Sequence, residues 1–191
     1  AVVIELIDKA VALDTLETNK AAYLKWLGQE FVKQKNYAEA AKAYGRVISV
    51  KSNFTNVDLF NAGYNFYIVD AYDSSSRYFK LYTEKYPDDI MGYYMLGNAY
   101  SVIDSTSELG LAIPYFQKTI EIGEADTTRP NVKTRLMVAY KFFLGYYFNY
   151  KKNKDSALIY VDKALLLDPT DESMISNKEF NLKSLDSNCA S

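Results

Sequence analysis

The side chains that could carry out chemistry are few and follow no catalytic pattern. The chain has no histidine and one cysteine, Cys189, so a zinc site and histidine-dependent catalysis are excluded. Acidic residues gather at positions 88–89 and 121–126, but without the spacing of a calcium-binding loop. No nucleophile, base and orienting group share a recognisable spacing, and no glycine-rich phosphate loop occurs. The sequence therefore predicts a protein that is not an enzyme, with no cofactor and no metal.

Composition indicates a packed protein that is close to neutral. Apolar residues make up 49% of the 191 residues, enough for a sizeable core, and the net charge is −2. Such a charge offers no broad attraction to nucleic acid or to an anionic lipid surface. Lys141 interrupts the longest apolar stretch, at 137–148, well short of the roughly 18 residues of a membrane span. A single cysteine leaves the compartment open, so cytoplasmic and exported locations are both compatible with the sequence.

Glycines recur along the chain at a nearly constant interval. Gly28, Gly63 and Gly97 are 35 and 34 residues apart, and Gly145 follows 48 residues later. Self-similarity at such a period is typical of repeat proteins. Each glycine would cost about 1 kcal/mol inside a helix relative to alanine, so we expect a partner helix to approach closely there. The spacing predicts a series of two-helix hairpins whose glycines are explained by packing.

The pattern resembles the tetratricopeptide repeat, which carries Leu-Gly, an aromatic residue, a small residue and a second aromatic at fixed positions. Within Leu24–Ser52 these are Leu27-Gly28, Phe31, Ala40 and Tyr44. The resemblance implies an all-α fold, an α-α superhelix in which antiparallel helix pairs form a right-handed solenoid, in one domain over residues 1–191. The expected parts are a half-repeat helix at 1–17, repeats at 21–54, 56–88, 89–124 and 130–169, and a capping helix with a tail at 170–191.

Two insertions interrupt the repeat register. Three extra residues fall in the polar segment 104–110, which predicts a lengthened turn within the third repeat. About eleven more precede the fourth repeat, where Thr128 as N-cap and Pro130 in the first turn predict an early helix start. The first helix of that repeat is therefore expected to be long and to reach Tyr150.

The first residues of the chain look like half of a repeat. Residues 1–14 predict an amphipathic helix in which Ile7–Ala10 aligns with Val161–Ala164 of the fourth repeat's second helix. The matching first helix is missing, and the sequence lacks an initiator methionine. We expect the chain to be a piece of a longer protein, or a mature form that begins within a repeat.

In tetratricopeptide-repeat proteins the first helices line a concave groove, and the resemblance implies which residues form it here. They are Lys25, Gln29, Lys33, Asn61, Tyr64, Tyr67, Tyr94, Asn98, Phe142, Tyr146, Asn149 and Tyr150. Tyrosine supplies contact area at low entropic cost, and asparagine can hydrogen-bond an extended backbone. The family's carboxylate clamp is not expected, because Met91 and Met95 stand where two cations are required. Any one of these aromatic rings could instead fill space between neighbouring helices.

These residues favour a non-catalytic scaffold that binds a protein or an extended peptide segment, as part of a longer protein or assembly. An alternative is a carbohydrate-binding module of an exported bacterial protein, since a glycan can stack on aromatic rings while amides bond its hydroxyl groups. A third interpretation is a structural spacer whose groove is filled by a neighbouring domain. The sequence does not specify the partner.

Overall fold

A computed structural model describes residues 2–186, which form ten α-helices, one π-helical segment and no strand. The all-α prediction is confirmed, whereas Cys189 lies outside the described residues. The helices are α1 (Val2–Leu13), α2 (Glu17–Lys33), α3 (Tyr37–Val50), α4 (Asn56–Ile68), α5 (Tyr72–Lys85), α6 (Ile90–Ile103), α7 (Ile113–Ala125), α8 (Val132–Gly145), α9 (Lys154–Leu167) and α10 (Glu172–Asp186), with the π-helical segment η1 (Tyr146–Tyr150) between α8 and α9.

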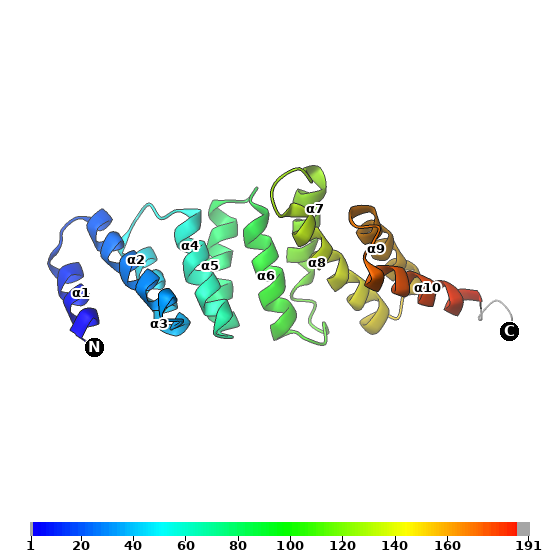
Figure 1. The fold of residues 1–191 in the computed structure, drawn as a ribbon, viewed down its shortest axis with the longest axis horizontal. Coiled ribbons are helices and arrows are strands. Elements are labelled where there is room, and N and C mark those ends of the chain that lie inside the picture. The colour runs from blue at the N-terminus through cyan, green and yellow to red at the C-terminus, as the bar shows by residue number, and fades with distance from the viewer. Residues whose placement is uncertain (1, 187–191) are drawn as a thin grey trace. The chain divides into compact units, whose positions relative to one another are not determined.

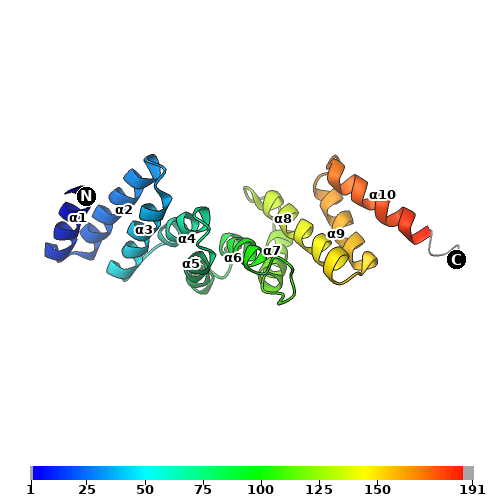
Figure 2. The ribbon, with the colours of Figure 1, turned by 90° about the horizontal axis from the view of Figure 1, so that it is seen from below.

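The chain divides into two compact units, residues 1–103 and 104–191. In the first unit, α1 to α6 pack in chain order, each helix against the next (Figure 1). In the second unit, α7 packs on α8, α8 on α9, and α9 on α10, as a view from below also shows (Figure 2). Packing between chain neighbours is how helical repeats bury a continuous core. The grouping of these helices into four repeats and a half-repeat stays a prediction.

Two glycines lie directly beneath aromatic rings of the following helix. A Cβ atom at Gly28 would lie 2.9 Å from the Tyr44 ring, and one at Gly63 would lie 2.7 Å from the Phe79 ring. Both rings are buried, and Phe79 is wholly so. The predicted close approach is confirmed at these two positions. In each case an aromatic side chain of the following helix, α3 or α5, fills the space that the missing glycine side chain leaves.

Gly145 differs from these two, and its assignment to packing was wrong. A Cβ atom there would meet only the Asn149 Nδ2 atom, at 3.9 Å. The residue that corresponds to Tyr44 and Phe79 in this part of the chain is Val161, whose side chain is much smaller. Without a large ring to accommodate, the helix leaves open space at Gly145.

A buried carboxylate holds the first two helix hairpins together. Asp58, in the first turn of α4, is 2% exposed and accepts hydrogen bonds from the Lys25 ammonium at 2.5 Å and the Thr55 N–H at 2.9 Å. The Thr55 hydroxyl accepts in turn from the Asp58 N–H, which completes a capping box. Lys51, directly after α3, lies 3.4 Å from the same carboxylate. Helix α2, the end of α3 and the start of α4 therefore meet at one charged group.

The segment predicted to hold the inserted turn, at 104–110, follows α6 as non-helical chain with its own internal hydrogen bonds. Asp104 is buried, and its carboxylate accepts from the backbone N–H groups of Leu109 and Leu111, at 3.3 and 3.2 Å. A polar loop can be partly buried only when its backbone groups are paired in this way. The Asp104 carboxylate at the start of the segment therefore pairs two backbone N–H groups at its end.

The predicted start of the long helix was wrong by a few residues. Helix α8 begins at Val132, and Asn131 before it has a left-handed backbone, with a φ of 61°. Thr128 does not cap the helix, because its N–H and hydroxyl groups donate to the Asp126 carboxylate. Asparagine tolerates a left-handed backbone better than most residues, so it can turn the chain into α8. The helical path continues through η1 to Tyr150, as expected.

Side-chain bonds tie the helices of the second unit together, and a helix, α10, lies where the capping helix is predicted. Glu124 of α7 accepts from the Tyr140 hydroxyl of α8 and the Lys163 ammonium of α9, both at 2.7 Å. On α10, Met174 is buried. Asp171, the residue directly before α10, pairs with Lys141 of α8 at 2.9 Å.

The glycine–ring contacts predict opposite effects of one substitution at two sites. Gly63→Ala should lower the free energy of unfolding by about 1–3 kcal/mol, because the new methyl group overlaps a ring that cannot move away. Gly145→Ala should raise it by up to about 1 kcal/mol, because the methyl group has space and alanine favours the helix. Urea unfolding of the full chain, followed by circular dichroism, measures both. Shifts of the same sign and size would contradict this account.

The Asp58 cluster predicts a pH-dependent contribution to stability. Burial raises the pKa of Asp58, but the Lys25 ammonium and the Thr55 N–H lower it by more, so it lies below its ordinary value of 3.8. A carboxylate whose pKa is lowered by folding adds to the free energy of unfolding at pH values above its ordinary pKa. This addition is lost as the pH falls through the pKa of the folded state. Asp58→Ala should lower the free energy of unfolding by about 3 kcal/mol at pH 7.

The free energy of unfolding of Asp58→Ala is expected to be lower than that of the natural chain, and this difference should shrink as the pH falls from 6 to about 2. Urea unfolding at a series of pH values measures it. Asp162→Ala is the matched control, because Asp162 pairs with Lys178 on the exposed surface and should contribute little at any pH. A deficit for Asp58→Ala that is the same at all pH values would show that the ion pair is not its cause.

Candidate functional site

Three of the predicted groove tyrosines lie on two helices of the first unit. Tyr64 and Tyr67 lie on α4, and Tyr94 lies on α6. Tyr64 is 40% exposed and stacks on Phe60 of the same helix, with ring centroids 5.1 Å apart. Burial raises the pKa of Tyr67, and the nearby Tyr94 hydroxyl raises it further.

Two asparagines flank these tyrosines, and their side-chain amides are not used within the fold. Asn61 precedes Tyr64 by three residues on α4, and Asn98 follows Tyr94 by four on α6, so each lies beside its tyrosine on the helix surface. Both asparagines are half-buried, and neither side-chain amide has a hydrogen-bond partner among the residues that the structure describes. We call Asn61, Tyr64, Tyr67, Tyr94 and Asn98 the tyrosine–amide face.

A third asparagine shows what a structural amide looks like in the same helix. Asn65 is 5% exposed, and its Nδ2 atom donates to the Asn61 carbonyl oxygen at 2.7 Å. A buried amide of this kind is satisfied within the fold, as most buried polar groups are. The free amides of Asn61 and Asn98 are therefore available for a bond to another molecule.

The basic end of the predicted groove is already engaged within the chain. The Lys25 ammonium pairs with Asp58, and the Lys33 ammonium pairs with Glu30 at 2.6 Å. Gln29, between them on α2, is exposed. Neither ammonium can bind a carboxylate of a ligand without sharing or giving up its present partner.

The predicted groove residues of the second unit form a ladder of rings. Phe142, Tyr146 and Tyr150 follow one another at intervals of four residues, and their ring centroids are 6.3 and 5.7 Å apart in stacked geometry. Tyr150 is 39% exposed, and Asn149 beside it is exposed. Phe143 is wholly buried and stacks on Tyr160 of α9 at 4.8 Å. We call Phe142, Tyr146 and Tyr150 the aromatic ladder.

The π-helical segment explains how the ladder ends. In η1 the Lys151 N–H donates to the Tyr146 carbonyl oxygen, five residues back, at 3.0 Å. Such a wider turn is frequent at functional sites. The Lys151 ammonium lies over the Tyr150 ring, 5.0 Å from its centroid, and the Tyr150 hydroxyl donates to the Glu108 carbonyl oxygen at 3.4 Å. These contacts hold the last ring of the ladder in place.

The chemistry available at these surfaces is contact and neutral hydrogen bonding. Among residues 2–186, no group of His, Cys, Asp and Glu side chains could hold a metal ion. No helix in that part of the chain is both long and apolar enough to cross a bilayer.

Sequence reasoning overlooked Asp58, although Thr55 followed three residues later by an acidic residue is a recognised capping signal.

No protein-family model matches the sequence, and no curated protein matches it. Several solved structures do match. The C-terminal part of a TPR repeat-containing protein from Cytophaga hutchinsonii is 23% identical, with a TM-score of 0.75 over 91% of this chain and 65% of that one. MamA AMB-1 is 21% identical, with a TM-score of 0.61 over 87% of this chain and 83% of the other.

A further match is YrrB, described as a TPR protein with an unusual peptide-binding site. It is 15% identical, with a TM-score of 0.59 over 92% of this chain and 85% of YrrB. Identities this low establish the fold alone. The glycine register, the packing of each helix on its chain neighbour and these structural matches agree: the chain has the tetratricopeptide-repeat fold.

Proposed function

We propose that this chain is a non-catalytic scaffold that binds an extended segment of a partner protein on the tyrosine–amide face. The observation that supports this most directly is the pair of half-buried amides, Asn61 and Asn98, with no partner among the described residues. Neither amide belongs to the buried side-chain atoms without a partner, so each keeps contact with water and can exchange that contact for a hydrogen bond to a ligand.

An extended peptide backbone has the matching chemistry. Each of its residues offers one N–H donor and one C=O acceptor, and an asparagine side chain provides both a donor and an acceptor. Tyr64, Tyr67 and Tyr94 add large amphipathic rings that lose little conformational entropy on binding. The face therefore combines contact area with the hydrogen bonds that an extended strand needs.

The aromatic ladder offers a second surface of related chemistry within the second unit. Its rings are partly exposed, and the free side chain of Asn149 lies between Tyr146 and Tyr150 in the sequence. A protein of the same fold, YrrB, is described as having a peptide-binding site, which supports peptide binding as a use of this architecture. We assign the ladder to contacts with the same class of partner.

The double variant Asn61→Ala with Tyr64→Ala tests the tyrosine–amide face. Peptides selected on the natural chain from a random 12-residue display library serve as probes, and fluorescence anisotropy measures their dissociation constants. The double variant should weaken binding by about tenfold or more, because it removes a free amide and an exposed ring. Its thermal unfolding should be nearly unchanged, since neither side chain is part of the buried core.

The matched control removes one amide and one aromatic ring elsewhere. Gln117 of α7 is exposed, and Phe180 of α10 is 60% exposed. Gln117→Ala with Phe180→Ala should leave peptide affinity unchanged. The proposal fails if both double variants weaken binding equally, or if the Asn61 and Tyr64 variant loses several degrees of melting temperature.

A further inference from the structure

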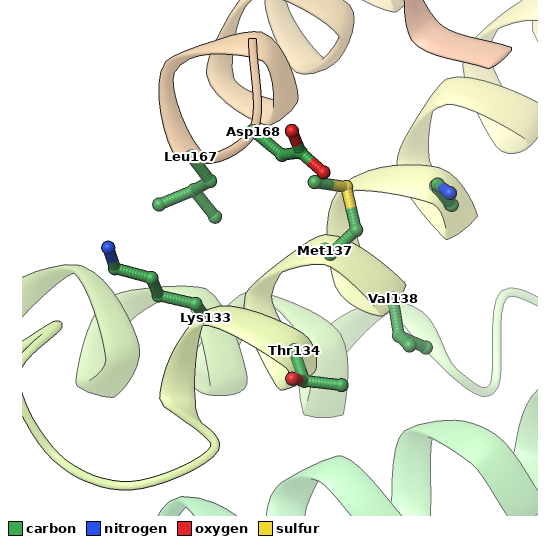
Figure 3. A pocket seen from close by; sticks show the side chains of 7 residues that line it. Lys133, Thr134, Met137, Val138, Leu167 and Asp168 are labelled. Atoms are coloured by element: carbon green, nitrogen blue, oxygen red, sulfur yellow. The ribbon is translucent and has the colours of Figure 1, made fainter. Parts of the chain in front are cut away.

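A pocket of about 420 Å³ lies in the second unit, between the first turns of α8 and the end of α9 (Figure 3). It is lined by Lys133, Thr134, Met137, Val138, Lys141, Leu167 and Asp168. None of these residues belongs to the tyrosine–amide face or to the aromatic ladder. The volume falls within the range of small-ligand sites in proteins, roughly 300–1,000 Å³.

The inserted residues before the fourth repeat build one wall of this pocket. By the glycine register, Val138 is the residue that matches Ala21 and Asn56, the first positions of the earlier repeats. Lys133, Thr134 and Met137 precede that position and lie on turns that a regular repeat does not have. The pocket is therefore a feature that this chain adds to the repeat.

The inner surface of the pocket is apolar and still accessible. Met137, Val138 and Leu167 are each half-buried, so their side chains keep part of their surface in contact with water. A compact apolar group placed between them would remove that surface from water, which is favourable. Methionine adapts its shape to such a group easily.

The charged side chains around the pocket differ in how far they are satisfied. Lys141 pairs with Asp171. Asp168 accepts from the N–H and the hydroxyl of Thr170, at 3.0 and 2.7 Å, which closes the turn after α9. Lys133 is exposed and has no ion-pair partner in the part of the chain that the structure describes. Figure 3 shows it extending on the Leu167 side of the pocket, away from Asp168.

We propose that this pocket binds a compact apolar group that carries one carboxylate. The apolar part would lie against Met137, Val138 and Leu167, and the carboxylate would accept a charge-assisted hydrogen bond from Lys133. The Lys133 ammonium, which has no ion-pair partner among the described residues, disfavours a cationic group beside it, and the Asp168 carboxylate disfavours a second negative charge on the ligand. A free branched-chain acid and the last residue of a peptide both have this chemistry. The inference does not rest on the function proposed above, because the two sites share no residue.

Titration with three small probes, followed by two-dimensional NMR of the full chain, tests the proposal and separates the two sources. N-acetyl-leucine represents a peptide end, N-acetyl-leucinamide is the same molecule without the charge, and 4-methylpentanoate is a free acid. N-acetyl-leucine should bind with a dissociation constant on the order of 1–10 mM and shift the amide signals of Met137 and Leu167. The uncharged amide should bind about fivefold more weakly.

Lys133→Gln should reduce the affinity for N-acetyl-leucine to that of the amide and leave the affinity for the amide unchanged. Arg77→Gln is the matched control, because it removes one positive charge from an exposed position on α5 in the other unit. Met137→Lys should abolish binding of all probes, since its longer charged chain enters the apolar space.

The relative affinities for N-acetyl-leucine and 4-methylpentanoate decide whether the natural ligand is a peptide end or a free acid. Binding of 4-methylpentanoate as tight as that of N-acetyl-leucine supports a free acid, and much weaker binding supports a peptide end. Three results would overturn the proposal: no shift at Met137 or Leu167 with any probe up to about 20 mM, equal affinity for the acid and the amide, or an affinity for the acid that Lys133→Gln does not change.

Discussion

The fit of an aromatic ring against a glycine on the preceding helix sets the geometry of the first unit. Tyr44 over Gly28 and Phe79 over Gly63 fix how near the helices lie and how each is rotated about its axis. On α4 this rotation places Leu59 and Ala62, both fully buried, toward the core. Because 3.6 residues make one turn, Asn61 and Tyr64 point away from the side of the helix that carries Leu59 and Ala62. The exposure of Tyr64 and of the Asn61 amide therefore follows from the same contact that buries Gly63.

Sequence reasoning succeeded where the controlling interactions are local or periodic. The glycine register predicted the close approach of a partner helix at Gly28 and Gly63, where the rings of Tyr44 and Phe79 lie. A short polar segment between two periodic stretches likewise identified the inserted turn at 104–110. These features depend on residues within a few positions of one another, or on one motif repeated at a fixed spacing, and both can be read along a single chain.

The features that sequence reasoning did not predict depend mostly on contacts between residues that are distant in sequence. The pairing of Lys25 with Asp58 joins residues 33 positions apart, and the pocket joins the start of α8 to the end of α9. No periodicity identifies such partners. The π-helical turn at Tyr146–Tyr150 is a local feature, yet the aromatic residues there suit an α-helix equally well. The error at Gly145 has a different origin, because the glycine keeps its place in the pattern while the corresponding residue of the next helix is the smaller Val161.

The charges of the chain are used mainly for structure, which determines the kind of recognition left to its surfaces. Lys25 and Lys33 are bound to Asp58 and Glu30, and the Glu124 carboxylate links three helices. What the tyrosine–amide face offers a partner is ring area and neutral hydrogen bonds, which salt screens far less than exposed ion pairs. Lys133 departs from this pattern. It lies on turns that the repeat does not require, where no neighbouring helix constrains the residue type, so a charge can remain free there to bind a ligand.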